Sequence, residues 1–278
     1  MRMKNQFTFG LTILLGGVVW LQILLLWLQE LFGYNPQWGL LHDILGKPTQ
    51  LDLLVYHGLY VLTLYGGLKA LWFLMEQFIL ERNWNKTINA KLHKSYTQKM
   101  NRKFADIGFR IMVIEDDSVV AMTCNFIVPR IVVSTKAIQQ FSDRELDTVI
   151  WHETSHCRNR DPLRSLILRT LEKSLPYLPI FKRFTHYIMV WMELLADQNS
   201  IRKMRTAQDL ASILLKCSQL MRRQSVGVGF ADAAINYRIQ QLVVPDQEVK
   251  VPIFEYHSLI FSISSVILLT AAVFGSCA

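Results

Sequence analysis

Two histidines four residues apart, with a glutamate directly after the first, are the residues in this chain best suited to chemistry. They lie in "WHETSHCRNRD" as His152, Glu153 and His156. Residues four apart share one helical face, so both imidazoles can bind the same metal ion. A glutamate beside the first histidine can take a proton from a water bound to that metal. The spacing predicts a zinc-dependent hydrolase with one ion per chain and Glu153 as general base. The alternative is an ordinary polar helix.

A catalytic zinc site needs a third protein ligand and leaves one position open for water. The downstream carboxylates are Asp161, Glu172, Glu193, Asp197, Asp209, Asp232, Asp246, Glu248 and Glu255. We expect Glu193 to bind the metal, because "WMELLADQNS" is an apolar setting in which a carboxylate needs a partner. Asp197 lies one turn further on the same face, where it can accept the free ring N–H of a ligand histidine. The alternative for this pair is a solvated acidic face.

The motif is expected on a helix that follows a small β-sheet. Ser142 and Glu145 form a capping-box pattern at the start of this helix. "FRIMVIEDDSVVAM" (109–122) predicts a β-hairpin that turns at an acidic cluster. "NFIVPRIVVS" (125–134) predicts a third strand, which Pro129 would confine to the sheet edge or mark with a bulge. A substrate segment could pair with this edge in extended form.

Three segments with little or no charge predict membrane-spanning helices, at about 9–32, 53–78 and 256–276. The first could instead be a cleaved signal peptide, but it is longer than the usual apolar stretch of about 7–15 residues and lacks a small-residue cleavage site. Residues 163–192 are also apolar, but they carry six charges and are broken by Pro176 and Pro179. We expect an interfacial helical hairpin there, with a buried core helix or a fourth span as alternatives.

The charge distribution predicts an orientation in the membrane. The whole net charge of +8 lies in residues 81–255, which contain 26 Lys and Arg against 18 Asp and Glu. Basic residues flank the first two spans at the ends that the positive-inside rule places in the cytoplasm: Arg2, Lys4, Arg82, Lys86, Lys91 and Lys94. The connector 33–50 contains only Lys47 and Asp43. We therefore expect the N-terminus inside, the central domain in the cytoplasm and the C-terminus outside. Mixed charge signs and the lack of a reader motif argue against direct nucleic-acid binding and favour the lipid bilayer as partner.

The chain resembles the integral-membrane zinc peptidases of the BlaR/MecR type. The resemblance rests on "HETSHCRNRD" with "ELLAD", and extends through "NFIVPRIVVSTKAIQQFSDRELDTVIWHE", "AQDLASILLKCSQL" and "AINYRIQQLVVP". It implies zinc on His152, His156 and Glu193, Glu153 as general base and Asp197 in support. The HtpX and CAAX-protease type of membrane peptidase shares the same HExxH and ExxxD pattern and is the second choice.

The resemblance implies a membrane-embedded zinc endopeptidase that cuts a protein substrate at the cytoplasmic face, in a regulatory role, with a transcriptional repressor as one possible substrate. The alternatives are a quality-control peptidase of the HtpX type and a receptor or scaffold with a structural zinc site. Structural sites are closed and usually rich in cysteine, which argues against the last alternative. The sequence does not identify the residue that stabilises the oxyanion. His186, Tyr187 and Arg202 are candidates because they lie near Glu193 in the sequence. We expect no penicillin-binding domain after the last apolar segment, so the sequence does not indicate the activating signal.

These features together predict an α+β membrane protein. It should be mostly α-helical, with about three to four transmembrane helices and a cytoplasmic zincin-like domain that contains a small β-sheet. The expected domains are an N-terminal helical hairpin (1–80), a zinc metallopeptidase domain (81–255) and a C-terminal transmembrane helix (256–278). The expected location is the cell membrane, with several passes, and the sequence leaves the oligomeric state open.

Overall fold

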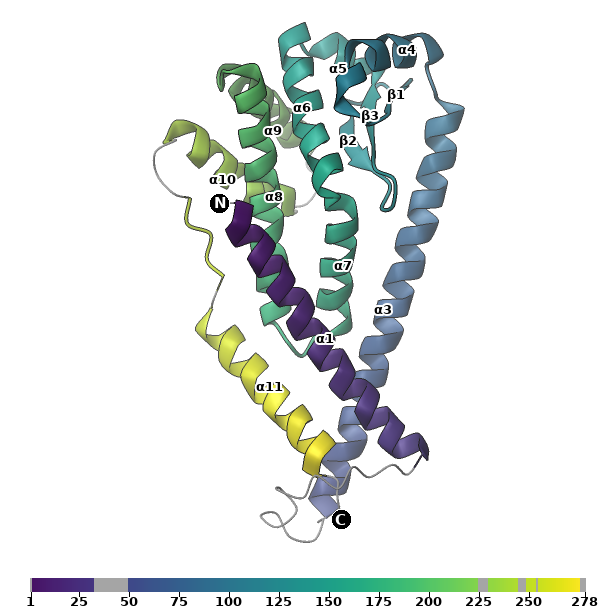
Figure 1. The fold of residues 1–278 in the computed structure, drawn as a ribbon, viewed down its shortest axis with the longest axis vertical. Coiled ribbons are helices and arrows are strands. Elements are labelled where there is room, and N and C mark those ends of the chain that lie inside the picture. Colours follow the sequence, from purple (N-terminus) through teal and green to yellow (C-terminus); the bar gives the residue numbers. More distant parts are fainter. Residues whose placement is uncertain (1, 33–49, 225–229, 245–248, 254, 276–278) are drawn as a thin grey trace. The chain divides into compact units, whose positions relative to one another are not determined.

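The computed structural model describes residues 2–32, 50–224, 230–244, 249–253 and 255–275, and these are mostly helical (Figure 1). The predicted mainly helical chain with a small β-sheet is therefore confirmed. The longer helices are α1 (Arg2–Phe32), α3 (Gln50–Ala90), α6 (Asp143–Asn159), α7 (Asp161–Ser174), α8 (Ile180–Met204), α9 (Gln208–Gln224), α10 (Phe230–Val243) and α11 (Tyr256–Gly275). The shorter elements are α4 (Lys94–Lys103), η1 (Ala105–Ile107), α5 (Thr135–Gln140), β1 (Ile111–Ile114), β2 (Ala121–Cys124) and β3 (Arg130–Ser134).

The chain divides into two compact units. The first contains Met1–Asn5, Glu76–Ile167 and His186–Val251, and it includes the sheet and the HExxH helix. The second contains Gln6–Met75, Leu168–Thr185 and Pro252–Ala278. The turn between α7 and α8 therefore groups with the apolar helices α1, α3 and α11.

The sheet of the first unit has the strand order β1–β3–β2. β1 pairs with β3 in parallel, with Ile111 opposite Ile131, and β2 pairs with β3 antiparallel, with Ala121 opposite Val133. The predicted β-hairpin over 109–122 is wrong, because β3 lies between its two strands. The predicted edge position of 125–134 is also wrong. Pro129 directly precedes β3, so its missing N–H removes no hydrogen bond from the ladder.

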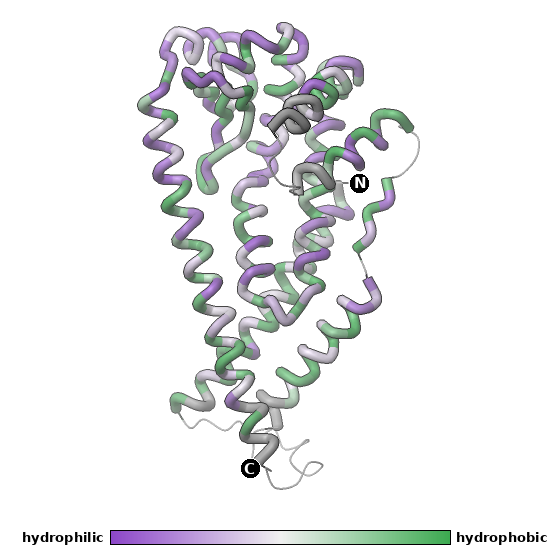
Figure 2. Tube along the Cα trace, turned by 180° about the vertical axis from the view of Figure 1, so that it is seen from behind, coloured by the Kyte–Doolittle hydropathy of each residue, from purple (hydrophilic) through white to green (hydrophobic). Residues whose placement is uncertain are grey.

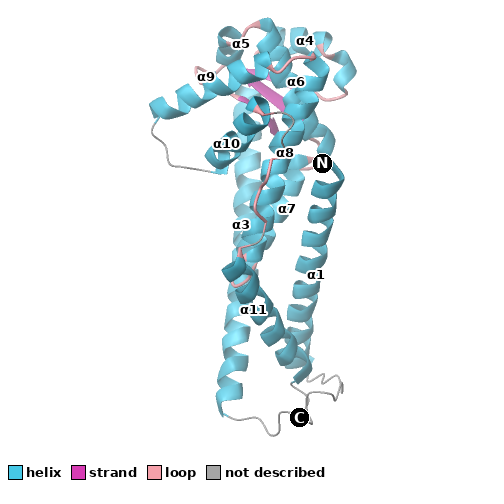
Figure 3. Cartoon of the chain, turned by 90° about the vertical axis from the view of Figure 1, so that its left-hand side faces the viewer, coloured by secondary structure: helices cyan, strands magenta, loops and turns pink. Residues whose placement is uncertain are grey.

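The two faces of the sheet are buried against different helices. Figure 3 shows the strands of this small sheet among the helices. Side chains alternate between the faces along each strand, as the period of two requires. One face packs on α6 through Ile111, Val113, Ile131, Val133, Leu146, Val149 and Ile150. The other face packs against the end of α3 through Met112, Ile114, Val132, Cys124 and Ile88. The sheet therefore holds α6 in place, and α6 carries the histidine motif.

The second unit is built on α1, α3 and α11. Both α1 and α3 are long and apolar enough to cross a membrane, over Met3–Leu28 and His57–Ala90 (Figure 2). Polar side chains link the helices: Trp27 donates a hydrogen bond to the Thr63 hydroxyl (3.2 Å), and Gln22 donates to the Thr270 hydroxyl (3.0 Å). Such bonds stabilise helix association where water is absent.

The prediction of three to four transmembrane helices must be corrected. Among the described residues only the two helices above qualify as candidate spans. The described apolar stretch of α11, Tyr256–Ala271, falls short of the about 20 residues that cross the hydrocarbon. The end of the predicted third span, residue 276, and most of the connector 33–50 lie outside the described residues.

Residues 163–192 form a helical hairpin and are not among the candidate spans, while the expected interfacial position stays a prediction. Helix α7 ends at Ser174 and α8 begins at Ile180, with Pro176 and Pro179 between them. The segment also has buried apolar side chains typical of a packed core: Leu168, Leu175, Leu178, Phe181, Phe184 and Ile188. Much of this hairpin is therefore buried, as the alternative of core helices predicts.

Gly66 of α3 lies close to the backbone at the end of α7. A Cβ at this position would lie 2.3 Å from the backbone oxygen of Ser174, which cannot move aside like a flexible side chain. We predict that Gly66→Ala lowers stability by about 1–3 kcal/mol, as overpacking does. Gly58→Ala on the same helix is the control, because a Cβ there meets nothing within 4 Å. Thermal unfolding of both variants in detergent checks this; equal melting temperatures would contradict the close approach.

Candidate metal centre

Helix α6 begins with the predicted capping box. The Ser142 hydroxyl accepts a hydrogen bond from the backbone N–H of Glu145, and the Glu145 carboxylate accepts one from the backbone N–H of Ser142. The same carboxylate is buried and accepts hydrogen bonds from Ser212 (2.6 Å) and Lys216 (2.7 Å) of α9. Glu145 thus fixes both the start of the motif helix and its packing on α9.

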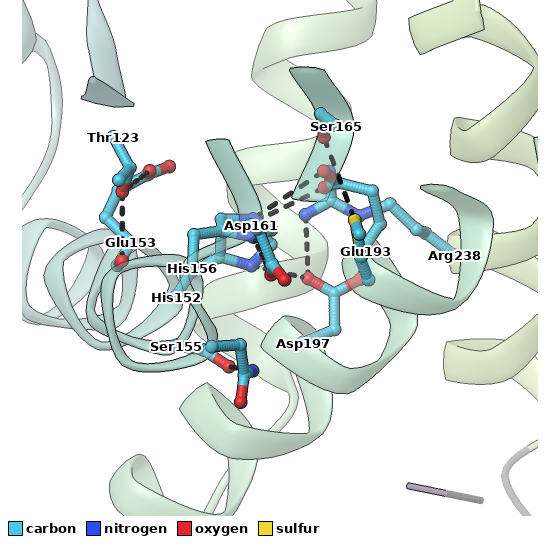
Figure 4. Close-up of polar contacts among 12 residues, drawn as sticks. Thr123, His152, Glu153, Ser155, His156, Asp161, Ser165, Glu193, Asp197 and Arg238 are labelled. Atoms are coloured by element: carbon cyan, nitrogen blue, oxygen red, sulfur yellow. Dashed lines mark hydrogen bonds and ion pairs between the residues drawn. The ribbon is translucent and has the colours of Figure 1, made fainter. Parts of the chain in front are cut away.

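The ring nitrogens of His152 and His156 converge on one point beside α6 (Figure 4). Both side chains are largely buried, and their Nε2 atoms lie 3.1 Å apart. Each Nδ1 faces a different carboxylate at 2.9 Å, namely Asp197 for His152 and Asp161 for His156. A carboxylate that holds the N–H of one ring nitrogen leaves the other nitrogen as a lone-pair donor. The two imidazoles therefore present two donors to the same point.

Glu193 reaches this point from α8. Its Oε2 lies 3.4 Å from Nε2 of His152, and its Oε1 lies 3.6 Å from Nε2 of His156. The ligand atoms of the three residues all lie within 4.8 Å of one another, which is the spacing of a group that can hold a metal ion. Helix α8 is held to α6 by Asn199, whose side chain donates to the backbone oxygen of Trp151 (2.9 Å). The structure thus brings the three expected metal ligands together.

The electrostatics of this cluster favour a positive charge between the three side chains. Burial alone would lower the pKa of His152, but the carboxylates of Asp197 and Glu193 outweigh it and raise the pKa to about 10. Burial likewise opposes protonation of His156, yet Glu193 and Asp161 raise its pKa. Burial would raise the pKa of Glu193, but the two histidines and Arg238 hold it below its usual range. A divalent metal ion supplies the charge that these groups attract, and two imidazoles with one carboxylate are a donor set typical of catalytic zinc.

Arg238 of α10 is a member of the site that the sequence did not reveal. Its guanidinium binds both oxygens of Asp197, at 2.7 Å each, and lies 3.2 Å from Oε2 of Glu193. Asp197 therefore serves His152 and Arg238 together, as its expected supporting position suggested. Asp161 was also missed in this position, since the sequence offered it only as one of many carboxylates. Arg164 binds its second oxygen at 3.1 Å.

Glu153 is buried on the neighbouring face of α6, against the sheet (Figure 4). The hydroxyl of Thr123 in β2 lies 2.8 Å from Oε2 of Glu153 and 3.0 Å from its backbone oxygen. It also lies 3.6 Å from Sγ of Cys157, so this buried free thiol faces the sheet and not the histidine cluster. Thr123 thus fixes the carboxylate of the expected general base, and the sequence gave no sign of this contact.

The three candidates for stabilising an oxyanion have other contacts. The His186 ring faces Tyr237, with the ring centroids 6.3 Å apart. Tyr187 is buried beside Trp191. Arg202 lies close to the side chain of Asn199 on its own helix. Arg238 is the cation that the structure places beside Glu193.

Fold and site together define a helical protein with a small sheet and a buried His–His–Glu cluster on an HExxH helix. The family model described as BlaR1 peptidase M56 matches residues 49–242, which is more than two thirds of the chain. The chain therefore belongs to the BlaR1 peptidase family, and the expected BlaR/MecR type is confirmed. This family membership implies peptidase activity. No curated protein is significantly similar to the chain.

Glu145 should make stability depend on acid pH. Burial opposes its ionisation, but Lys216, Ser212 and the backbone of Ser142 lower its pKa to about 2 from an ordinary value of 4.5. A lowered pKa in the folded state stabilises the fold fully above the unfolded value, and the contribution is lost as pH falls toward the folded value. The stability difference between wild type and Glu145→Gln should thus be constant above about pH 5 and shrink toward about pH 2. Thermal unfolding across this range measures it, and a difference that does not change with pH contradicts the ionised contact.

Measurements of metal binding should distinguish the metal ligands from the carboxylates that orient them. We predict that Glu193→Ala loses the metal, and that Asp161→Asn binds it about 10–100-fold more weakly because His156 loses its orienting carboxylate. Asp147→Asn is the control, since Asp147 of α6 forms its ion pair with Lys103 of α4 and not with a histidine of the cluster. Competition with a zinc chelator and elemental analysis give the affinity and content. One zinc per chain in Glu193→Ala would assign the third ligand elsewhere.

Proposed function

We propose that this chain is a zinc-dependent endopeptidase of the membrane that hydrolyses peptide bonds of a protein substrate. One observation carries the proposal: the Nε2 atoms of His152 and His156 and the carboxylate of Glu193 converge, with Glu153 next to His152 on the same helix. Family membership supports the peptidase activity. The donor set of two imidazoles and one carboxylate leaves a position open, as catalytic zinc requires and structural zinc does not.

The roles of the chain's own residues follow from this geometry. Zinc held by the three ligands would supply Lewis acidity and a lowered pKa for the attacking water. Glu153 accepts the proton of that water at its carboxylate and passes it to the leaving amine. Thr123 holds this carboxylate in position, and Arg238 holds Glu193 and Asp197. Arg238 also keeps positive charge near the site as negative charge develops on the scissile carbonyl.

The substrate backbone has an available strand to pair with. The edge strand next to Glu153 is β2, and not the segment 125–134. The N–H of Ser134 donates to the oxygen of Val120, so hydrogen bonding alternates along β2 from that pair. The backbone groups of Ala121 and Thr123 then point away from β3, toward the open edge. An extended peptide that pairs with them would run beside the Glu153 carboxylate, which Thr123 contacts.

The membrane location and the substrate class belong to the same proposal. Two apolar helices support attachment to a membrane. The basic residues beside them support a multi-pass arrangement in the cell membrane, with the N-terminus and the first unit in the cytoplasm and the C-terminus outside. A regulatory substrate such as a transcriptional repressor is the preferred class.

Replacing the general base should separate metal binding from cleavage. We predict that Glu153→Gln keeps the metal and abolishes proteolysis, because glutamine cannot accept the proton. Quantitative proteomics of cells with wild type or Glu153→Gln, at equal expression, should yield protein fragments made only by wild type. Cleavage by Glu153→Gln would remove the general-base role. Degradation of many unfolded proteins instead of one substrate would favour quality control.

The hydrogen bond from Thr123 to Glu153 should affect the rate of cleavage without changing the metal content. We predict that Thr123→Val lowers kcat about tenfold on the substrate protein identified by proteomics, because Glu153 loses the hydroxyl that orients its carboxylate. Thr123→Ser should restore the rate, since it keeps the hydroxyl. Metal content and KM should be the same in all three proteins. A rate in Thr123→Val equal to that in wild type would leave the contact without a role in catalysis.

A further inference from the structure

The turn between β2 and β3 exposes two large apolar side chains. Ile127 is 75% exposed and Val128 is 72% exposed. No residue from Val119 to Pro129 is charged. Contiguous exposed apolar side chains are a feature of contact surfaces. Figure 2 shows this turn as an apolar tip at the end of the two strands.

The turn is fixed in place and is held against α3. Asn125 has a positive φ of 72°, a left-handed conformation that asparagine tolerates, and this directs the chain out of β2. The backbone N–H of Phe126 donates to Glu81 (3.1 Å), and the Phe126 ring packs edge-on against Phe78 at 6.0 Å between centroids. At the start of β3, Arg130 donates to the side chain of Asn85. These contacts hold the tip beside one stretch of α3.

That stretch of α3 is where the helix should leave the hydrocarbon. Only Lys69 and Glu76 are charged between His57 and Leu80, whereas Glu81, Arg82 and Lys86 follow closely. The hydrocarbon is about 30 Å thick, and about 20 helical residues cross it. A span that begins at His57 would thus end near Phe78. Phe78, Ile79 and Leu80 are all at least half exposed, as side chains facing lipid would be.

We propose that the tip formed by Ile127 and Val128 inserts into the bilayer interface at the cytoplasmic end of α3. Basic side chains also lie on the stretch of α3 that holds the tip. Arg82 and Lys86 are exposed on α3, four and eight residues after Phe78, where they can bind anionic headgroups. Two aliphatic side chains beside basic residues are the composition of an interfacial anchor. The lipid contact would place the β2 edge, and the substrate paired with it, at the membrane surface.

This inference rests on the proposed membrane location and not on the peptidase activity. Site-directed labelling of the full chain in vesicles that contain anionic lipid tests it. A fluorophore is attached at Ile127→Cys, Asp117→Cys or Leu64→Cys, each with Cys217 and Cys277 replaced by Ser. Asp117 is exposed at the other end of the β2 strand, and Leu64 is exposed within the candidate span. A protein without an introduced cysteine measures labelling of the buried Cys124 and Cys157.

A label at Ile127 should be quenched by nitroxide-labelled lipids and shielded from aqueous iodide. We expect iodide quenching at Ile127 to be at least about twofold weaker than at Asp117, with Leu64 the most strongly quenched by lipid. Equal iodide quenching at Ile127 and Asp117, with Leu64 still quenched by lipid, would overturn the tip insertion alone. Loss of lipid quenching at Leu64 would instead overturn the membrane location of α3. Shielding of Ile127 only after a protein substrate is added would assign the tip to the substrate, and would overturn the lipid contact.

Discussion

The structure depends on the placement of two imidazole Nε2 atoms and one carboxylate around a single point. The two Nε2 atoms lie 3.1 Å apart, so their lone pairs repel unless a proton or a metal ion lies between them. Each neighbouring element contributes to holding this arrangement. Helix α6 sets the spacing of the histidines, α8 supplies Glu193, and α10 supplies Arg238, which neutralises part of the acidic charge. Asp197 fixes the ring orientation of His152, and Asp161 fixes that of His156. The core between the sheet and α6, and the contact of Glu145 with α9, then serve to keep α6 in one position.

The parts of this site that could be predicted from the sequence are those set by local spacing. Histidines four apart, a capping box and a pair of carboxylates four apart are determined within one helix, and the structure shows each of them where expected. Glu193 could be chosen because an acidic residue among apolar neighbours needs a partner. Arg238 and Thr123 could not be found this way. Arg238 lies 41 residues from Asp197 and Thr123 lies 30 residues from Glu153, and no local pattern records which distant elements meet.

The predicted strand order of the sheet was wrong for the same physical reason. The residues of β1 and β2 are each typical of a strand, but alternation does not say which strands are neighbours. The acidic cluster between them looked like a hairpin turn, whereas β3 inserts between the two strands and pairs with both. Pro129 was assigned to the interior of a strand that begins one residue later. The membrane helices were misjudged in a different way. Composition indicates how apolar a segment is, but a span needs about 20 such residues in one helix, and the described apolar stretch of α11, Tyr256–Ala271, is shorter.

β2 connects the two proposals, because one short segment contains both contacts. Thr123 binds the carboxylate of Glu153, and Phe126, three residues later, binds α3 beside the apolar tip. A strand is stiff along its length, and β2 is paired with β3 over all four of its residues. A tip held in the bilayer interface would therefore fix the position of Thr123 relative to the membrane, and with it the general base and the open edge. Peptide segments that emerge from the bilayer in extended form would meet this edge at the same height. The segment that orients the base would in this way also select where on a membrane-associated substrate the chain can cut.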